Sequence, residues 1–467
     1  MSLVVYNTLS RKKEEFKPII DGHVGMYVCG PTVYGYPHLG HAKSYVCFDT
    51  IYRYLIHLGY KVKYVQNITD VGHLVGDQEE GEDKIERIAK LEEIDPVEIA
   101  YKFENIYFDA MNKLNVLKPS ISSRATGHII EIIDMVKTLI DKGYAYVTKE
   151  GNVYYRVNKF NNYGLLSNRT LDNTVSGERI DVASDKENPE DFALWKKAES
   201  GHLMKWPSPW GLGYPGWHIE CSVMSRKYLG DTFDIHGGGM DNIFPHHECE
   251  IAQSEAATGK PFVKYFIHNN LVTVNGQKMG KSLGNFITLN DLFKEFNPSV
   301  IRFYILLNHY RKPTDFNKEQ LEETSKIYDK LAETVKAIRN EIRDYNTEIV
   351  KDLEIEILKN KFLEAMDDDF NTGLAITYLY EAQKIANKEL ADNKEKNKLS
   401  NIDKFIKELA EGVLGLRFEE NTSNHEKELL EIIQGIRNKY REEKNYAESD
   451  KIRDAVKAIG ITLNDRR

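Results

Sequence analysis

The first 70 residues carry a hydrophobic pattern that predicts a β-α-β unit. Residues 24–29 form a short apolar run that predicts a buried strand, and Gly30 and Pro31 end it. Apolar residues then recur at helical spacing over residues 39–58, and residues 61–68 predict a second strand. A strand, a helix and a second strand in this order are typical of a parallel sheet.

The ends of these two strands are the first place to expect a ligand. Parallel sheets of this kind bind ligands at the carboxyl ends of their strands. Cys29 lies at the end of the first strand, and Thr69 and Asp70 follow the second. The pattern therefore places these three residues at one edge of the sheet.

A middle region interrupts this pattern before the sheet resumes. Residues 144–157 alternate apolar and polar positions around a turn, which indicates a hairpin, and residues 165–200 are polar and predicted to be irregular. Residues 232–236 and 263–267 predict two further strands, with a helix near 245–258 between them. We therefore expect an insertion between two halves of one sheet domain.

The character of the chain changes beyond about residue 318. Glycine becomes scarce, and Leu, Ile, Ala, Lys and Glu recur at helical spacing. This predicts helices to the end of the sequence, with a seam between two helical units near residues 395–402. The expected fold class is an α/β Rossmann-type parallel-sheet domain with an inserted segment, followed by an α-helical C-terminal region.

Composition excludes several classes of protein. The chain has 467 residues, of which 41% are hydrophobic and 29% charged, so it is globular rather than disordered. Its formal net charge of -9 disfavours binding of nucleic acid through overall positive charge. No apolar run approaches the roughly 20 residues that cross a bilayer. With only four cysteines, we expect a protein of the reducing cytoplasm that does not contact a membrane.

Two histidines lie where the first helix is predicted to begin. The first turn of a helix has unpaired N–H groups and a partial positive charge, which suits a phosphate. His38 and His41 are three residues apart and share a face, while Gly40 between them lets a ligand approach the backbone. The pattern indicates hydrogen-bond donors to a phosphate; the alternative is two ordinary histidines at a helix start.

A second basic motif lies in the sequence Lys-Met-Gly-Lys-Ser. Its lysines, Lys278 and Lys281, are three residues apart and flanked by small residues, which favours a cationic loop that closes on a polyphosphate. The alternative is a solvated charged turn, which is commoner for a single pair of lysines at this spacing.

Candidate metal ligands occur near residues 221–250. A zinc site needs three or four sulfur, nitrogen or oxygen ligands that converge on one point. His246 and Glu250 are four residues apart on the predicted helix and share a face. With Cys29 and Cys221 they would complete a set of two cysteines, one histidine and one glutamate.

The spacing leaves other pairings open. His246 with Cys249, and His247 with Glu250, also share a helix face at a spacing of three. Each of these residues taken alone is more often a buried packing residue than a ligand, because cysteine is among the most buried residue types.

The histidine and lysine motifs, about 240 residues apart, together resemble the paired signatures of class I aminoacyl-tRNA synthetases. Over nearly its whole length the chain is similar to the cysteinyl-tRNA synthetase family. The segments that carry this resemblance are YVCGPTVYGYPHLGHA, YVQNITD, GWHIECS, FDIHGGGMDNIFPHHECEIAQSE, KMGKSLGNF and the tail AESDKIRDAVKAIGITLND. The family usually has serine where this chain has Gly280, a change expected to affect the stiffness of the lysine loop more than its charge.

The resemblance implies a reaction and its participants. The family activates L-cysteine with ATP to form cysteinyl-adenylate and pyrophosphate, and then transfers cysteine to the 3′ end of tRNA(Cys). It implies one Zn²⁺ per chain that selects the substrate thiolate, Mg²⁺ bound with ATP, and a monomeric cytoplasmic enzyme of protein synthesis.

The resemblance also implies roles for individual residues. The metal ligands would be Cys29, Cys221, His246 and Glu250. The amino-acid pocket would include Cys29, Thr69 and Trp217. The catalytic residues would be His38, His41, Lys278 and Lys281, and ATP would contact His38, Gly40, His41, Gly238, Asp241 and Lys281.

The same resemblance implies six parts of the chain. Residues 1–110 and 201–270 would form the two halves of a Rossmann-type catalytic domain, separated by a connective insertion at 111–200. Residues 271–317 would connect this domain to a helical bundle at 318–400 and carry the lysine loop. Residues 401–467 would form a helical anticodon-binding domain, whose end lacks a short extension that many relatives have.

Two alternatives stay open at this point. A cysteine ligase that uses the same adenylation core but transfers cysteine to an amino-sugar would share these motifs, although the long helical tail favours a tRNA acceptor. A non-catalytic zinc-bound protein that binds tRNA would be expected to lose the histidines or lysines of the phosphate motifs, and both sets are intact.

Overall fold

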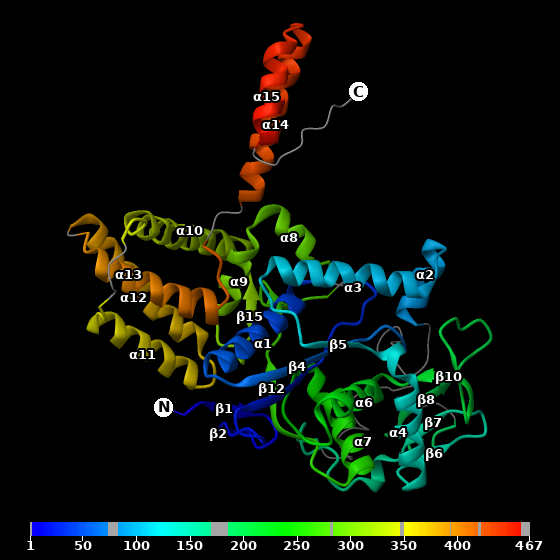
Figure 1. Ribbon diagram of the computed structural model, residues 1–467. Coiled ribbons are helices and arrows are strands. Elements are labelled where there is room, and N and C mark those ends of the chain that lie inside the picture. The colour runs from blue at the N-terminus through cyan, green and yellow to red at the C-terminus, as the bar shows by residue number, and fades with distance from the viewer. Residues whose placement is uncertain are drawn as a thin grey trace. The chain divides into compact units, whose positions relative to one another are not determined.

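The computed structural model describes residues 2–72, 83–169, 185–280, 284–345, 350–392, 394–418 and 422–458 (Figure 1). It consists of two compact units, residues 1–417 and residues 418–467. The sheets and the helical bundle belong to the first unit, and the last two helices belong to the second.

A five-stranded parallel sheet forms the centre of the first unit. Its strand order is β12-β11-β3-β4-β5, and every neighbouring pair is parallel. Strands that are covered on both faces lose the alternation of polar and apolar residues, which explains the continuous apolar runs in the sequence. The strands are β3 (His23–Val28), β4 (Lys61–Ile68), β5 (Ile121–Arg124), β11 (Phe233–Gly239) and β12 (Val263–Asn269).

Helix α1 (Leu39–His57) connects β3 to β4, so the predicted β-α-β unit and the α/β fold class are confirmed. The other helices near this sheet are α2 (Lys84–Glu92), α3 (Pro96–Lys113), α6 (Trp217–Leu229), α7 (Glu248–Thr258), α8 (Leu289–Glu295) and α9 (Pro298–Leu306). A turn over Ile243–His247 leads into α7.

A second, antiparallel sheet interrupts the first. Its order is β6-β7-β8-β10-β9, and the predicted hairpin is its β6-β7 pair. Its strands are β6 (Ala145–Val147), β7 (Val153–Tyr155), β8 (Phe192–Lys197), β9 (Trp206–Ser208) and β10 (Gly211–Pro215).

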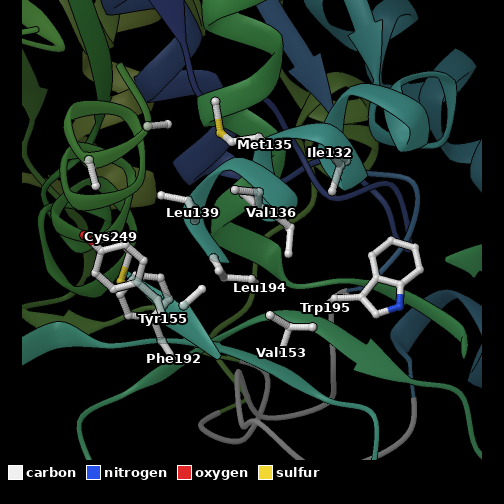
Figure 2. Packing of buried hydrophobic residues seen from close by; sticks show 14 of the residues in the cluster. Ile132, Met135, Val136, Leu139, Val153, Tyr155, Phe192, Leu194, Trp195 and Cys249 are labelled. Carbon is white, nitrogen blue, oxygen red and sulfur yellow. The ribbon is translucent and has the colours of Figure 1, made fainter. Parts of the chain in front are cut away.

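The prediction that residues 165–200 are irregular is wrong for β8. Phe192, Leu194 and Trp195 of this strand are buried against helix α4 (Ile129–Asp141) and its neighbours. Figure 2 shows Val136 and Leu139 on one side of this cluster and Leu194 on the other. The strand is short and has polar residues on both sides, so its pattern does not stand out in the sequence. Its apolar residues are buried by a helix that lies about 50 residues earlier in the chain.

Two smaller sheets complete the first unit. Strands β1 (Val4–Asn7) and β2 (Lys12–Glu15) form an antiparallel pair. Strand β13 (Val272–Val274) pairs with β14 (Gln277–Lys278) and with β15 (Thr314–Phe316).

The C-terminal part is helical, as predicted. Helices α10 (Lys318–Glu341), α11 (Leu353–Asp367), α12 (Thr372–Ala391) and α13 (Lys396–Phe405) pack together in the first unit, and a helical turn over Ile406–Val413 follows. The expected seam at 395–402 falls within α13, and the chain divides after Arg417. The second unit contains α14 (Thr422–Glu442) and α15 (Tyr446–Ala458). Among the described helices, none is long and apolar enough to cross a bilayer.

Candidate functional site

A cavity of about 760 Å³ opens at the carboxyl ends of β3, β4 and β11. Its wall includes Cys29, which directly follows β3, Thr69, which follows β4, and Gly238, the residue before the last of β11. These residues are far apart in the sequence, and the parallel sheet brings them to one edge. The ligand site expected from the sequence at this edge of the sheet therefore coincides with a cavity in the structure.

The four predicted metal ligands converge beside this cavity, and three of them line it. One ligand atom each from Cys29, Cys221, His246 and Glu250 lies within 4.8 Å of the other three. His246 Nε2 is 3.1 Å from Glu250 Oε1, and Cys29 Sγ is 3.9 Å from the same oxygen. Two sulfurs, one imidazole nitrogen and one carboxylate oxygen at these separations fit the donor set of a zinc site.

A second, overlapping donor set lies behind the first. It shares Cys29 and Glu250 but uses His236 and His247 in place of Cys221 and His246. The two sets differ in access, because Cys29, Cys221 and His246 line the cavity whereas the second pair of histidines does not. A substrate in the cavity could therefore reach only the first set directly.

His236 was not expected at this site from the sequence, although the spacing of the histidines contains one signal. Five of the 14 histidines, His218, His236, His246, His247 and His268, fall within a stretch of about 50 residues. Which of them converge depends on the register of β11 against β3 and on the turn into α7, and neither is visible from spacing.

The additional histidines hold the candidate ligands in place. His236 Nε2 lies 2.8 Å from Glu250 Oε2, and His247 Nε2 lies 3.2 Å from Cys29 Sγ. His218 Nδ1 lies 3.0 Å from His246 Nδ1, which leaves Nε2 of His246 directed at Glu250. Partners of this kind fix the orientation of metal ligands.

Burial favours the uncharged forms of these groups. It raises the pKa values of the Cys29 and Cys221 thiols and of the Glu250 carboxyl, and it lowers the pKa of His247. A divalent cation held by Cys29, Cys221 and Glu250 would supply positive charge that favours the thiolates and the carboxylate.

Cys249 and Cys47 belong to the packing of the protein. Cys249 lies in the hydrophobic cluster of Figure 2, with its sulfur 3.4 Å from the hydroxyl of Tyr163. Neither cysteine belongs to a metal-binding cluster in the part of the chain that the structure describes. The pairing of His246 with Cys249, which spacing left open, is therefore excluded.

His38 and His41 form one stacked pair at the start of α1. Their ring centroids are 3.9 Å apart. The backbone N–H of Gly40 donates to Nδ1 of His38, and the backbone N–H of His38 donates to Nδ1 of His41, both at 3.1 Å. An imidazole that accepts at Nδ1 carries its proton on Nε2 when neutral. Burial lowers the pKa of His41, so this ring presents a neutral N–H donor.

The two glycines of the predicted ATP site, Gly40 and Gly238, each leave room for a histidine ring, that of His38 and that of His247. A Cβ on Gly40 would lie 2.9 Å from Cε1 of His38. A Cβ on Gly238 would lie 2.8 Å from Cε1 of His247. Asp241 is exposed and lines the same cavity as both glycines.

Thr69 and Trp217, which the resemblance assigns to the amino-acid pocket, both line the cavity. The Thr69 hydroxyl donates to Oε2 of Glu220 at 3.0 Å and accepts from Nδ2 of Asn67 at 3.1 Å. The Trp217 ring lies 4.5 Å from the ring of His246, measured between centroids. Trp217 therefore lies against a candidate metal ligand.

The lysine motif is only partly described. Lys278 belongs to β14, and Met279 lines the cavity after it. Lys281 lies outside the described residues, as does Ser282. The structure thus brings the strand that leads into the motif to the cavity.

Two family models match the chain. Residues 15–326 match the model of the tRNA synthetases class I (C) catalytic domain, and residues 361–419 match the model of the DALR domain. The cysteine–tRNA ligase of Chlorobium chlorochromatii is 50% identical, over 100% of this chain and 98% of its own length. Those of Thermus thermophilus and Bacteroides fragilis are both 47% identical, over 100% of this chain and 98% and 97% of their own lengths.

Solved structures with the same fold are more distant in sequence. Mycobacterium tuberculosis methionyl-tRNA synthetase, in complex with methionyl-adenylate, is 13% identical, with a TM-score of 0.64 over 84% of this chain and 92% of that one. The Agrobacterium radiobacter LeuRS in a ternary complex is 11% identical, with a TM-score of 0.62 over 85% of each chain. At these identities the comparison shows a shared fold.

Proposed function

Because the chain belongs to the cysteine–tRNA ligase family of class I aminoacyl-tRNA synthetases, and so is an ATP-dependent ligase, we propose that it charges tRNA(Cys) with L-cysteine through an adenylate and selects cysteine with a bound zinc ion. The observation that carries this proposal is the convergence of Cys29, Cys221, His246 and Glu250 at the wall of the cavity that also contains the paired histidines.

The proposed zinc ligands are Cys29, Cys221, His246 and Glu250, the set of which the first three line the cavity. When bound, Zn²⁺ supplies a soft Lewis acid that favours the thiolate of cysteine over the hydroxyl of serine. Shape alone separates such near-isosteres by roughly 1–3 kcal/mol. The proposed set therefore accounts for selection of cysteine by the chemistry of sulfur, and Trp217 and Thr69 shape the pocket around it.

The phosphate motifs supply charge stabilisation. The substrate carboxylate attacks the α-phosphorus of ATP, a bond forms between them, and pyrophosphate leaves. We assign the Nε2–H groups of His38 and His41 to hydrogen bonds with the phosphate oxygens, where negative charge builds. Lys278 and Lys281 would steady the pyrophosphate, and Mg²⁺ would accompany ATP.

Gly238 and Asp241 complete the proposed nucleotide site. Gly238, the residue before the last of β11, lines the cavity, and the exposed carboxylate of Asp241 follows three residues later. We assign Asp241 to accept a hydrogen bond from a ribose hydroxyl, while Gly238 leaves space that a side chain would fill.

The helical end would bind the tRNA. The curated relatives match over the full chain, including this end, and this favours a tRNA acceptor over an amino-sugar. The division at 401–467 as the anticodon-binding part, a monomeric state and a cytoplasmic location in protein synthesis belong to the same proposal.

The test measures cysteine-dependent exchange of pyrophosphate into ATP, charging of tRNA(Cys), and zinc content. We expect exchange that needs cysteine and fails with serine, and about one zinc per chain. Cys221→Ser should lose both zinc and the binding of cysteine, whereas Cys47→Ser, at a cysteine outside the cluster, should keep both. Charging of an amino-sugar in place of tRNA, or exchange by a zinc-free enzyme at the unaltered rate, would overturn the proposal.

A further inference from the structure

The segment that carries the lysine motif is tied to helix α1 at both of its ends. The downstream end is tied through the backbone. The amide of Leu39 donates to the carbonyl of Ile287 at 3.2 Å, and the amide of Leu289 donates to the carbonyl of Pro37 at 2.9 Å. These bonds join the first turn of α1 directly to the chain that follows the lysine motif.

The upstream end is tied through one side chain, Lys43. Its ammonium group donates to the carbonyl of Leu271 at 3.1 Å and to the carbonyl of Lys312 at 2.7 Å. Leu271 directly precedes β13, the strand that pairs with β14 and so leads to Lys278. Lys312 lies just before β15, the other neighbour of β13.

Lys43 is an unusual residue for this position. It is 1% exposed, and no ion pair of Lys43 occurs within the ranges that the structure describes. A buried ammonium group must find hydrogen-bond acceptors to offset the loss of water, and two carbonyls at the edge of a sheet supply them. Burial lowers the pKa of Lys43 to about 8, in agreement with its removal from water.

The place of Lys43 on α1 connects it to the phosphate site. It lies two residues after His41, in the first turns of the same helix. The side chain of Met279 approaches to 3.7 Å of the position of a Cβ on Gly40, and the rings of His38 and Phe286 are 5.0 Å apart. A residue within the lysine motif and a residue that follows it therefore lie beside the histidine motif.

We propose that Lys43 is a positioning residue for the ATP reaction, which fixes the start of the lysine segment relative to the histidines of α1 by binding the carbonyls of Leu271 and Lys312. The proposal rests on the proposed function, since it concerns the same ATP site. It adds a residue that contacts neither substrate nor metal, and it predicts an effect on ATP that leaves the binding of cysteine unchanged.

The reason for a specific effect on ATP is geometric. The histidines that would hold the polyphosphate come from α1, and the lysines come from the lysine segment. The hydrogen bonds of Lys43 affect the position of these two segments relative to each other. A displacement of about 1 Å in a catalytic arrangement can cost on the order of 100-fold in rate. The proposed metal ligands lie directly after β3, on α6, in the turn before α7 and on α7, and neither hydrogen bond of Lys43 involves these parts of the chain.

The experiment compares Lys43→Met and Lys43→Arg with the unaltered enzyme in pyrophosphate exchange, with ATP and cysteine varied separately. We expect Lys43→Met to lower kcat/KM for ATP by about 10- to 100-fold and to leave KM for cysteine within about twofold. Lys43→Arg, which keeps a charged donor, should recover most of the loss.

A matched control is Lys142→Met. The ammonium group of Lys142 also donates to a backbone carbonyl, that of Ala257 at 2.6 Å, but it joins α4 to the end of α7. Thermal unfolding of each variant monitors folding, so that a loss of folded protein is separated from a loss of rate. The control should keep the unaltered kcat/KM for ATP.

The outcomes separate this inference from the proposed function. Absence of cysteine-dependent exchange in the unaltered enzyme would contradict the proposed function. Exchange in the unaltered enzyme together with an unchanged kcat/KM for ATP in folded Lys43→Met would overturn the role of Lys43 alone. Equal losses for ATP and for cysteine, or no recovery in Lys43→Arg, would likewise reduce Lys43 to a residue of general stability and refute the proposal.

Discussion

Replacement of Gly238 by alanine is the substitution whose effect follows most directly from the packing around the site. A Cβ at this position would lie 2.8 Å from Cε1 of His247 and 3.0 Å from its Nε2. The ring of His247 has little room to retreat, because its Nδ1 lies 2.8 Å from Nε2 of His268 and it packs beside His236 and Phe266. The added methyl group must therefore push the ring toward Cys29.

The magnitude follows from the cost of overpacking a buried site. Forcing one extra methyl group into a close-packed interior destabilises a protein by about 1–3 kcal/mol. His247 Nε2 lies only 3.2 Å from the Cys29 sulfur, so the displaced ring also disturbs a candidate metal ligand. Loss of such a supporting partner weakens metal binding by about 10- to 100-fold.

Urea unfolding and zinc competition with a chelator measure the two effects. Gly238→Ala should lower the free energy of unfolding by about 1–3 kcal/mol and weaken zinc affinity by at least about tenfold. Gly127→Ala is the matched control, because no atom lies within 4 Å of a Cβ added there. A Gly238→Ala enzyme with unaltered stability and unaltered zinc affinity would refute the packing argument.

Two further predictions concern stability. Arg302 and Asp49 form a fully buried ion pair, in which Nη2 and Oδ2 are 2.5 Å apart. Arg302→Met breaks this pair and should lower the free energy of unfolding, measured by urea titration, by about 3–5 kcal/mol. Lys294→Met, at an exposed ion pair, should change it by less than about 1 kcal/mol in the same titration. Burial lowers the pKa of His268 from 6.5 to about 3, so below pH 6.5 the unfolded chain binds a proton that the folded chain does not. The free energy of unfolding therefore decreases as the pH is lowered, by up to about 1.4 kcal/mol per pH unit. His268→Gln should reduce the slope between pH 6.5 and pH 5 by the contribution of this one histidine, while other buried histidines keep theirs; an unchanged slope in that variant would contradict the prediction.

The parallel sheet and its ligand edge were predictable because they depend on local patterns. The apolar runs of β3 and β4 and the helical spacing of α1 are each visible within 20 residues, and the rule for parallel sheets then places Cys29 and Thr69 together. Strand β8 escaped prediction because its apolar residues are few and their partners come from distant elements.

The metal cluster was predictable only in part. Spacing on a helix shows that His246 and Glu250 share a face, but it cannot show that Cys249 turns toward the core or that His236 reaches Glu250 from another strand. Lys43 illustrates the same limit, because a lysine in a helix is expected on the solvated face and its burial depends on two carbonyls more than 200 residues away.

The central claim is that a zinc ion held by Cys29, Cys221, His246 and Glu250 binds the sulfur of the substrate. X-ray absorption at the zinc edge counts the sulfur ligands directly. We expect two sulfurs at about 2.3 Å in the enzyme alone and three after addition of L-cysteine, with no change on addition of L-serine. A count of two sulfurs that cysteine does not alter, in an enzyme that still forms cysteinyl-adenylate, would contradict the account.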